Sequence, residues 1–141
     1  MRLADWRLLV AAWWSVFVTA LGLRLLGYGR LAPWIPVCRD RAIRDADRAK
    51  AAHYARWIEI ASRRQPLPAA CLAQSLTLLT WLRREGVPCV LQIGVAKAGA
   101  QFGAHAWVEL DGSPVNDTPR SVMAFTPLAA APTTGALLNS R

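Results

Sequence analysis

Cysteine and histidine are scarce in this sequence, and their placement excludes two common kinds of site. The three cysteines, Cys38, Cys71 and Cys89, are odd in number and irregularly spaced, so they do not form a disulfide framework. There is no CxxC pair and no cluster of cysteine with histidine, so we expect no zinc or other metal site. Cysteines without a disulfide pattern are typical of a reducing compartment, which predicts a cytoplasmic protein.

Acidic residues are also few. The chain has 9 Asp and Glu against 17 Lys and Arg, which gives a formal net charge of +8. Such a balance permits contact with nucleic acid, a membrane surface or an acidic peptide. The arginines are scattered and no nucleic-acid motif accompanies them, so we expect solvated helix faces and no nucleic-acid partner. With 54% hydrophobic residues, the 141-residue chain is expected to form one domain with a single core.

The N-terminal region contains a long stretch without charge, residues 8–23, bounded by Arg7 and Arg24. A membrane-spanning helix needs about 20 residues, so the stretch is short for that purpose. We expect a helix that packs on the domain or docks a partner protein. Association with a membrane and removal as a signal peptide are the alternatives that the sequence leaves open.

Glycine and proline divide the first part of the chain into helices. We predict helices over residues 5–27, 39–63 and 71–85, because glycines follow the first and third and prolines follow the second. In the second helix, apolar residues recur at steps of three or four and predict a buried stripe of Ile43, Ala46, Ala49, His53, Trp57 and Ile60.

The second part of the chain has the composition of strands. β-branched and apolar residues predict strands over residues 87–96, 104–110 and 113–117. Helices followed by a run of antiparallel strands predict an α+β domain. We assign residues 1–36 to the N-terminal helix and its linker and residues 37–141 to the main domain, with the two expected to form one structural unit.

Three residues in these elements have the chemistry of a nucleophilic site. Cys71 is predicted at the start of a helix, where unpaired N–H groups and the helix dipole favour a thiolate and can hold an oxyanion. His105 can act as the proton carrier, and Asp117 can orient its ring. Each residue also has a structural interpretation: Cys71 as a small packed side chain, His105 as a strand residue and Asp117 as a turn residue.

Several motifs around these residues resemble a known family. The segments CLAQSLTLLTWLRREG, VLQIGVA and FGAHAWVELDGSPVND resemble the B2 proteins of lasso peptide biosynthesis, which belong to the transglutaminase-like, papain-related cysteine peptidases. The resemblance covers about residues 63–119. It implies a transglutaminase-core-like fold and a catalytic triad of Cys71, His105 and Asp117.

The resemblance also implies a reaction and its partners. Members of this family remove the leader from a ribosomally made precursor, so that a lasso cyclase can close the ring. A separate leader-recognition protein is expected, since this chain has no room for a recognition domain ahead of the peptidase. The chemistry needs no metal or organic cofactor. Acyl transfer to an amine and a non-catalytic scaffold for a cyclase or a membrane partner remain the alternatives.

Two further residues are candidates near this site. Gln65 lies six residues before Cys71, which is the spacing of the oxyanion-hole glutamine in papain-like enzymes, and it could act with the Cys71 backbone N–H. Trp107 shares a strand face with His105 and is expected to line the substrate cleft or the core. Cys89 lies in a predicted strand and is expected to be a buried structural residue.

The turn at Asp111-Gly112 decides whether His105 and Asp117 can meet. A two-residue type I′ turn in a regular hairpin would place them on opposite faces of the sheet. A three-residue loop with Gly112 in a G1 bulge would place them directly opposite each other. We therefore predict the three-residue register, or another loop that keeps both side chains on one face.

Overall fold

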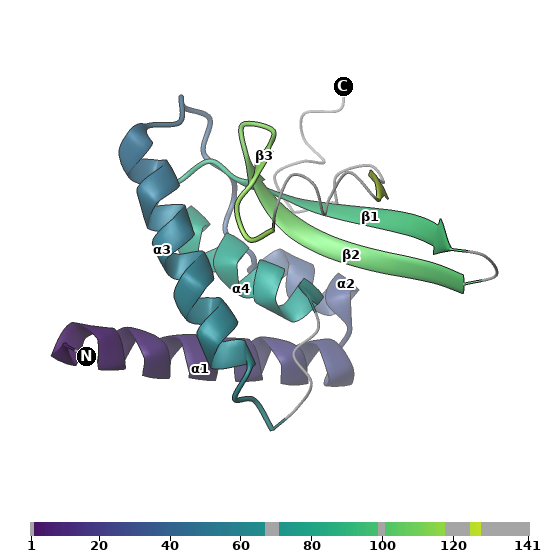
Figure 1. Cartoon of the computed structure of the whole chain (residues 1–141), viewed down its shortest axis with the longest axis horizontal. Helices are drawn as coiled ribbons and strands as arrows, with labels where there is room; N and C mark the ends of the chain where they lie inside the picture. The colour runs from purple at the N-terminus through teal and green to yellow at the C-terminus, as the bar shows by residue number, and fades with distance from the viewer. Residues whose placement is uncertain (1, 67–70, 99–100, 118–124, 128–141) are drawn as a thin grey trace.

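The computed structural model describes residues 2–66, 71–98, 101–117 and 125–127. The helices come first, as α1 (Leu3–Leu25), α2 (Tyr28–Leu31), the 3-10 helix η1 (Ala32–Trp34), α3 (Asp45–Ser62) and α4 (Cys71–Arg84). The strands β1 (Val90–Ala98), β2 (Gln101–Leu110), β3 (Ser113–Pro114) and β4 (Thr126–Pro127) form an antiparallel sheet in the order β3-β2-β1-β4. The predicted α+β class is confirmed (Figure 1).

α4 is the central helix of the fold. It lies between the sheet and the other long helices, α1 and α3 (Figure 1). Its buried side chains occur around most of its circumference, as expected for a helix surrounded by other elements: Ala73, Ser75, Leu76, Thr77, Leu78, Leu79, Leu82 and Arg83. Gly86, at a φ of +77°, follows the helix and provides the left-handed residue that the sequence predicted as its stop.

α1 has one face in the core and one face outside it. Its inner side chains Leu9, Ala12 and Val16 belong to the same apolar cluster as the buried residues of α3, α4 and the sheet. The expected packing of this helix on the domain is therefore confirmed. By length and composition α1 could also cross a membrane, although only 22% of its most apolar window is buried. The core helices of soluble proteins and signal sequences can have the same length and apolar composition.

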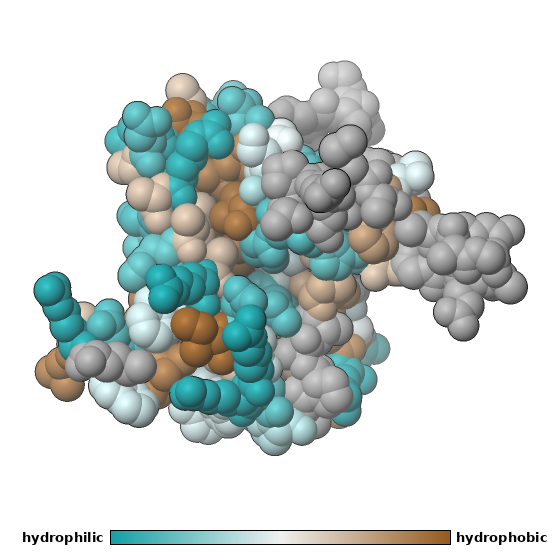
Figure 2. All heavy atoms as spheres, in the orientation of Figure 1, coloured by the Kyte–Doolittle hydropathy of each residue, from teal (hydrophilic) through white to brown (hydrophobic). Residues whose placement is uncertain are grey.

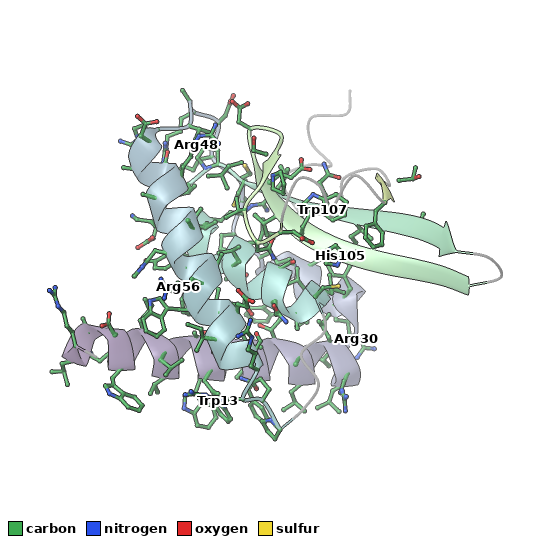
Figure 3. The ribbon with its side chains drawn as sticks, viewed as in Figure 1. Trp13, Arg30, Arg48, Arg56, His105 and Trp107 are labelled. Atoms are coloured by element: carbon green, nitrogen blue, oxygen red, sulfur yellow. The ribbon has the colours of Figure 1, made fainter. Side chains whose placement is uncertain are left out.

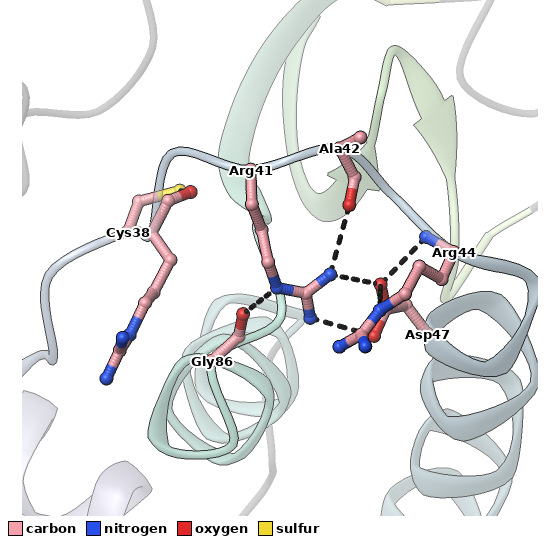
Figure 4. A network of polar contacts seen from close by, with 7 residues as sticks. Cys38, Arg41, Ala42, Arg44, Asp47 and Gly86 are labelled. Atoms are coloured by element: carbon pink, nitrogen blue, oxygen red, sulfur yellow. Dashed lines mark hydrogen bonds and ion pairs between the residues drawn. The ribbon is translucent and has the colours of Figure 1, made fainter.

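α3 begins at a buried ion pair (Figure 4). Arg41 donates to both carboxylate oxygens of Asp47, at 2.7 and 2.9 Å, and also to the Gly86 carbonyl at 3.0 Å. Asp47 also accepts the backbone N–H of Arg44 at 2.8 Å, which satisfies a donor at the helix start. These bonds fasten the first turn of α3 to the end of α4.

The predicted stripe is correct in part, because Ile43, Trp57 and Ile60 pack against the core. The buried residues are Asp47, Ala51, Ile58 and Ala61, whereas Ala46, Ala49 and His53 are exposed. The two hydrogen bonds from Arg41 allow Asp47 to be only 4% exposed. The small side chains of Ala51 and Ala61 are buried on the same helix. The predicted stripe did not include Asp47, a residue of a type that is rarely buried without a partner.

Candidate active site

Cys71 is the first residue of α4. The N–H groups of a first helical turn have no partner within the helix and carry the positive end of its dipole. The Cys71 side chain is partly exposed, and its Sγ accepts a hydrogen bond from the Ala106 backbone N–H at 3.4 Å. The hydrogen bond places the sulfur beside β2, at the residue that follows His105.

His105 is held from several sides (Figure 3). Its Nε2 is hydrogen-bonded to Asp117 Oδ2. Its ring lies against Trp107, with ring centroids 5.8 Å apart, and against Phe125 at 5.2 Å. Because Nε2 faces the carboxylate, Nδ1 is the ring atom through which a proton can be exchanged with a group on the other side.

Trp107 is packed beneath the histidine rather than open to solvent. It is 1% exposed, and its Nε1 donates to Glu109 Oε1 at 2.8 Å. Its six-membered ring crosses Gly94, where an added Cβ would lie 2.8 Å from Trp107 Cη2 and 2.7 Å from Phe125 Cβ. Of the two alternatives for Trp107, its burial favours the core. Glycine at position 94 makes room for the ring that supports His105.

The turn before Asp117 corrects the predicted register. Leu110 pairs with Ser113, and Asp111 and Gly112 have φ values of 51° and 79°, which is a two-residue type I′ turn and not the three-residue loop. The two catalytic candidates nevertheless meet, because the chain leaves the strand path. β3 ends at Pro114, and after one more backbone bond, from Val115 N–H to the Val108 carbonyl at 2.9 Å, the regular ladder stops.

A side-chain network takes the place of that ladder. Asn116 Oδ1 accepts the Val108 N–H at 2.8 Å, and Asn116 Nδ2 donates to Ser75 Oγ at 3.0 Å. Ser75 in turn donates to the Ala106 carbonyl at 3.0 Å. The network fixes the residues adjacent to both His105 and Asp117. Sequence reasoning missed Ser75 and Asn116, although one lies a helical turn after Cys71 and the other directly precedes Asp117.

Gln65 is placed differently from the prediction. Its Nε2, which is the donor that an oxyanion would need, donates to the Trp13 carbonyl of α1 at 2.9 Å. The structure therefore uses this amide to join the end of α3 to α1 and does not direct it to Cys71. The backbone N–H of Cys71 lies at the start of α4, as the sequence predicted.

The other two cysteines, Cys38 and Cys89, do not lie at the start of a helix. Cys89 is 2% exposed, and burial raises the pKa of its thiol to about 12, although the nearby Arg83 acts in the opposite direction. The expected burial of Cys89 is confirmed. Cys38 is partly exposed in the segment before α3, and its Sγ donates to the Arg39 carbonyl at 3.6 Å. Within the described ranges, no group of three or more His, Cys, Asp or Glu side chains is placed to hold a metal ion.

A groove borders the site on the side of Asp117. It has a volume of about 450 Å³ and lies between α3, α4 and the segment after β3. Its apolar floor includes Ala55, Ile58 and Leu78, and its polar groups include Arg56, Gln74 and Asp117. A groove of this size and character accommodates a peptide side chain with part of its backbone.

Comparison with known proteins identifies the family of the chain. A family model described as the transglutaminase-like superfamily matches residues 13–130. The match includes most of α1 and every described element after it. No curated protein and no solved structure gives a significant match.

Proposed function

Because the chain belongs to the transglutaminase-like superfamily, we propose that it is a cysteine peptidase that removes the leader from a lasso peptide precursor. Cys71 is the nucleophile, His105 the proton carrier and Asp117 the residue that orients the histidine. One observation carries the proposal: Asp117 binds Nε2 of His105, while the Cys71 sulfur accepts the N–H of Ala106, the residue next to His105.

The first half of the reaction is acylation. The Cys71 thiolate attacks the last carbonyl carbon of the leader, and negative charge develops on the carbonyl oxygen. The Cys71 backbone N–H at the positive end of α4 stabilises that charge. As the C–N bond breaks, protonated His105 gives its proton to the leaving amine of the core peptide, and the leader remains attached to Cys71 as a thioester.

The second half returns the enzyme to its starting state. Neutral His105 takes a proton from water, and the resulting hydroxide attacks the thioester carbonyl. The C–S bond breaks, the leader leaves as a carboxylic acid, and the Cys71 thiolate and protonated His105 are restored. Asp117 stabilises the imidazolium in both halves and holds the ring in one orientation.

The groove beside Asp117 is the proposed place for part of the leader. Gln74, which lines it, is one helical turn after Cys71, so the groove comes within about 5–6 Å of the nucleophile along α4. An extended peptide advances about 3.3 Å per residue. A residue about two or three positions from the scissile bond can therefore place its side chain between α3 and α4.

The motifs around the triad support the proposed lasso substrate and partners. The CLAQS helix start, the HAWVE strand and the ND pair carry the resemblance to leader peptidases. We propose that a separate leader-recognition protein delivers the precursor and that a lasso cyclase takes the released core peptide, all in the cytoplasm. Binding energy from the remote part of the leader would then come from the recognition protein.

A reconstituted reaction tests the proposal. Purified chain, a candidate lasso precursor and its recognition protein are combined, and the products are identified by mass spectrometry. We expect a leader with a free carboxyl terminus, and no detectable product with Cys71→Ala, because residues that act as one catalytic unit lose nearly all activity together. Cys38→Ala, which removes a thiol outside the site, is the matched control and should cleave normally.

Three outcomes contradict the proposal in different ways. Cleavage by Cys71→Ala at the wild-type rate would exclude the mechanism. A leader joined to an amine instead of water would indicate a transferase that uses the same acyl-enzyme. Full maturation in the presence of Cys71→Ala would indicate a scaffold.

A further inference from the structure

The outer side of α1 is apolar and exposed along the whole helix. Large apolar side chains recur there at steps of three or four, so they lie on one face, and each is between 37% and 80% exposed. We call this set the α1 outer face: Leu3, Trp6, Val10, Trp14, Val18, Leu21 and Leu25. In Figure 1, α1 runs along one edge of the molecule, with the other long helices and the sheet all on its inner side.

The size of this face exceeds what an isolated monomer usually shows to water. From Leu3 to Leu25 a helix extends over about 33 Å at about 1.5 Å per residue. Figure 2 shows apolar residues at the surface along the edge where α1 lies, with hydrophilic residues between them. Large exposed apolar patches mark surfaces that bind a protein or a membrane.

The charges around the face are positive. Arg2 and Arg7 lie at its beginning and Arg24 near its end, and all are exposed. The acidic residue of this region, Asp5, accepts the Arg2 backbone N–H at 3.0 Å and so caps the helix. Pairing two copies through this face, in either direction, would bring arginine ends against arginine ends. The charge pattern therefore disfavours a second copy and favours a negatively charged surface.

A groove that is also apolar and basic extends the α1 outer face toward α4. It has a volume of about 280 Å³, and Trp14 and Val18 of the outer face line it together with Trp81. Arg84, an exposed residue at the end of α4, also lines the groove. An arginine beside an apolar groove matches a phospholipid, whose phosphate is negative and whose acyl chain is apolar.

We propose that the α1 outer face lies on the surface of an anionic phospholipid bilayer. Tryptophan suits this position, because its ring is apolar and its N–H can bond to water or headgroups at the interface. The helix lies on the bilayer and does not span it. Its opposite face, with Ala12 and Val16 at 0% exposure, belongs to the protein core, and crossing the membrane would require the core to open.

Vesicle sedimentation with the full chain tests this surface. The probes are vesicles of phosphatidylcholine alone and vesicles of phosphatidylcholine and phosphatidylglycerol in equal parts. We expect binding to the vesicles with phosphatidylglycerol, weakened by salt, and little binding to phosphatidylcholine alone, because the arginines act through the surface charge.

Two matched variants locate the contact. Val18, on the outer face, and Val37, outside it, are both 61% exposed. Val18→Asp should weaken vesicle binding by about tenfold or more, since it removes one apolar side chain that the bilayer would bury and adds a negative charge that the anionic lipid repels. Val37→Asp makes the same change in net charge and should bind as the wild type does. Circular dichroism confirms that both variants are folded.

Several results would overturn the proposal. These are no binding to phosphatidylglycerol vesicles, equal binding to both kinds of vesicle without effect of salt, and equal loss in the two variants. Self-association in sedimentation velocity that Val18→Asp abolishes, with vesicles unbound, would assign the face to a second copy instead. Because these measurements need no substrate, their outcome is independent of the proposed peptidase activity.

Discussion

Ser75 and Asn116, 41 positions apart in the sequence, share a hydrogen bond of 3.0 Å that joins α4 to the residue before Asp117. Ser75 is fully buried, so the loss of this bond would leave a buried hydroxyl with fewer partners. Asn116 also receives the Val108 N–H, and Ser75 donates to the Ala106 carbonyl. The pair thereby connects the helix that begins with the candidate nucleophile to β2, which carries His105, and to the segment after β3, which carries Asp117.

Removal of the Asn116 side-chain amide should lower both the stability of the protein and its rate of cleavage. In Asn116→Ala, the Val108 N–H loses its acceptor, and we expect the free energy of unfolding to fall by about 1–3 kcal/mol. We also expect kcat to fall by about ten- to a hundredfold, since Asp117 loses its anchor. Urea unfolding and cleavage kinetics, at a temperature where the variant is fully folded, measure the two effects.

The hairpin offers a control for this prediction. Ser113→Ala changes an exposed residue of the same turn region. It should alter neither the free energy of unfolding nor kcat by a measurable amount. If Asn116→Ala is destabilised but cleaves at the wild-type kcat, the amide has a structural role only.

Gly94 should not tolerate a side chain. An alanine Cβ would lie 2.7 Å from Phe125 Cβ and 2.8 Å from Trp107 Cη2, both closer than van der Waals contact allows. We expect Gly94→Ala to lower the free energy of unfolding by about 1–3 kcal/mol and to slow cleavage, because the rings that must move also pack against His105. Gly29→Ala is the control, since no atom lies within 4 Å of its added Cβ. A Gly94→Ala protein as stable and active as Gly29→Ala would contradict this packing.

The sequence predicted the element order because each boundary has a local cause. Gly27 and Gly86 both adopt a positive φ after a helix, and Cys71 begins α4 after a proline-containing segment. The burial of Asp47 in α3 could not be predicted in this way. It depends on Arg41, which lies outside the helix and neutralises Asp47 by a tertiary contact.

The register after β3 had a similar non-local cause. The Asp111-Gly112 pair correctly indicated a two-residue turn, but we rejected that turn because a regular ladder would separate His105 from Asp117. The chain resolves the conflict at Asn116, whose side chain replaces a backbone acceptor with the help of Ser75. A side chain that substitutes for the ladder leaves no periodic signal in the sequence.

The cysteines should differ in their reactivity. Burial raises the pKa of Cys89 to about 12, so near neutral pH its thiolate is very scarce, and its sulfur is also shielded from reagents. We expect iodoacetamide to modify Cys38 and Cys71 in the native protein and to modify Cys89 only after unfolding in urea. Peptide mapping by mass spectrometry identifies the sites. Early modification of Cys89 in the folded chain would contradict the burial of this strand.

The contact between Arg41 and Asp47 should make stability depend on pH. The hydrogen bonds from Arg41, followed by the backbone N–H of Arg44, hold the pKa of the Asp47 carboxyl well below its usual range. A group whose pKa is lowered by folding contributes stability above its unfolded pKa, about 3.9 for aspartate, and loses that contribution as the pH falls toward the folded pKa. We therefore expect Asp47→Asn to lower Tm at about pH 7 and the difference in Tm from wild type to narrow below about pH 4.

Asp45→Asn, in the same first turn but exposed, should show a much smaller difference in Tm at either pH. Thermal unfolding followed by circular dichroism gives both comparisons, and a difference for Asp47→Asn that stays constant down to about pH 2 would mean that the ion pair does not set this part of the stability.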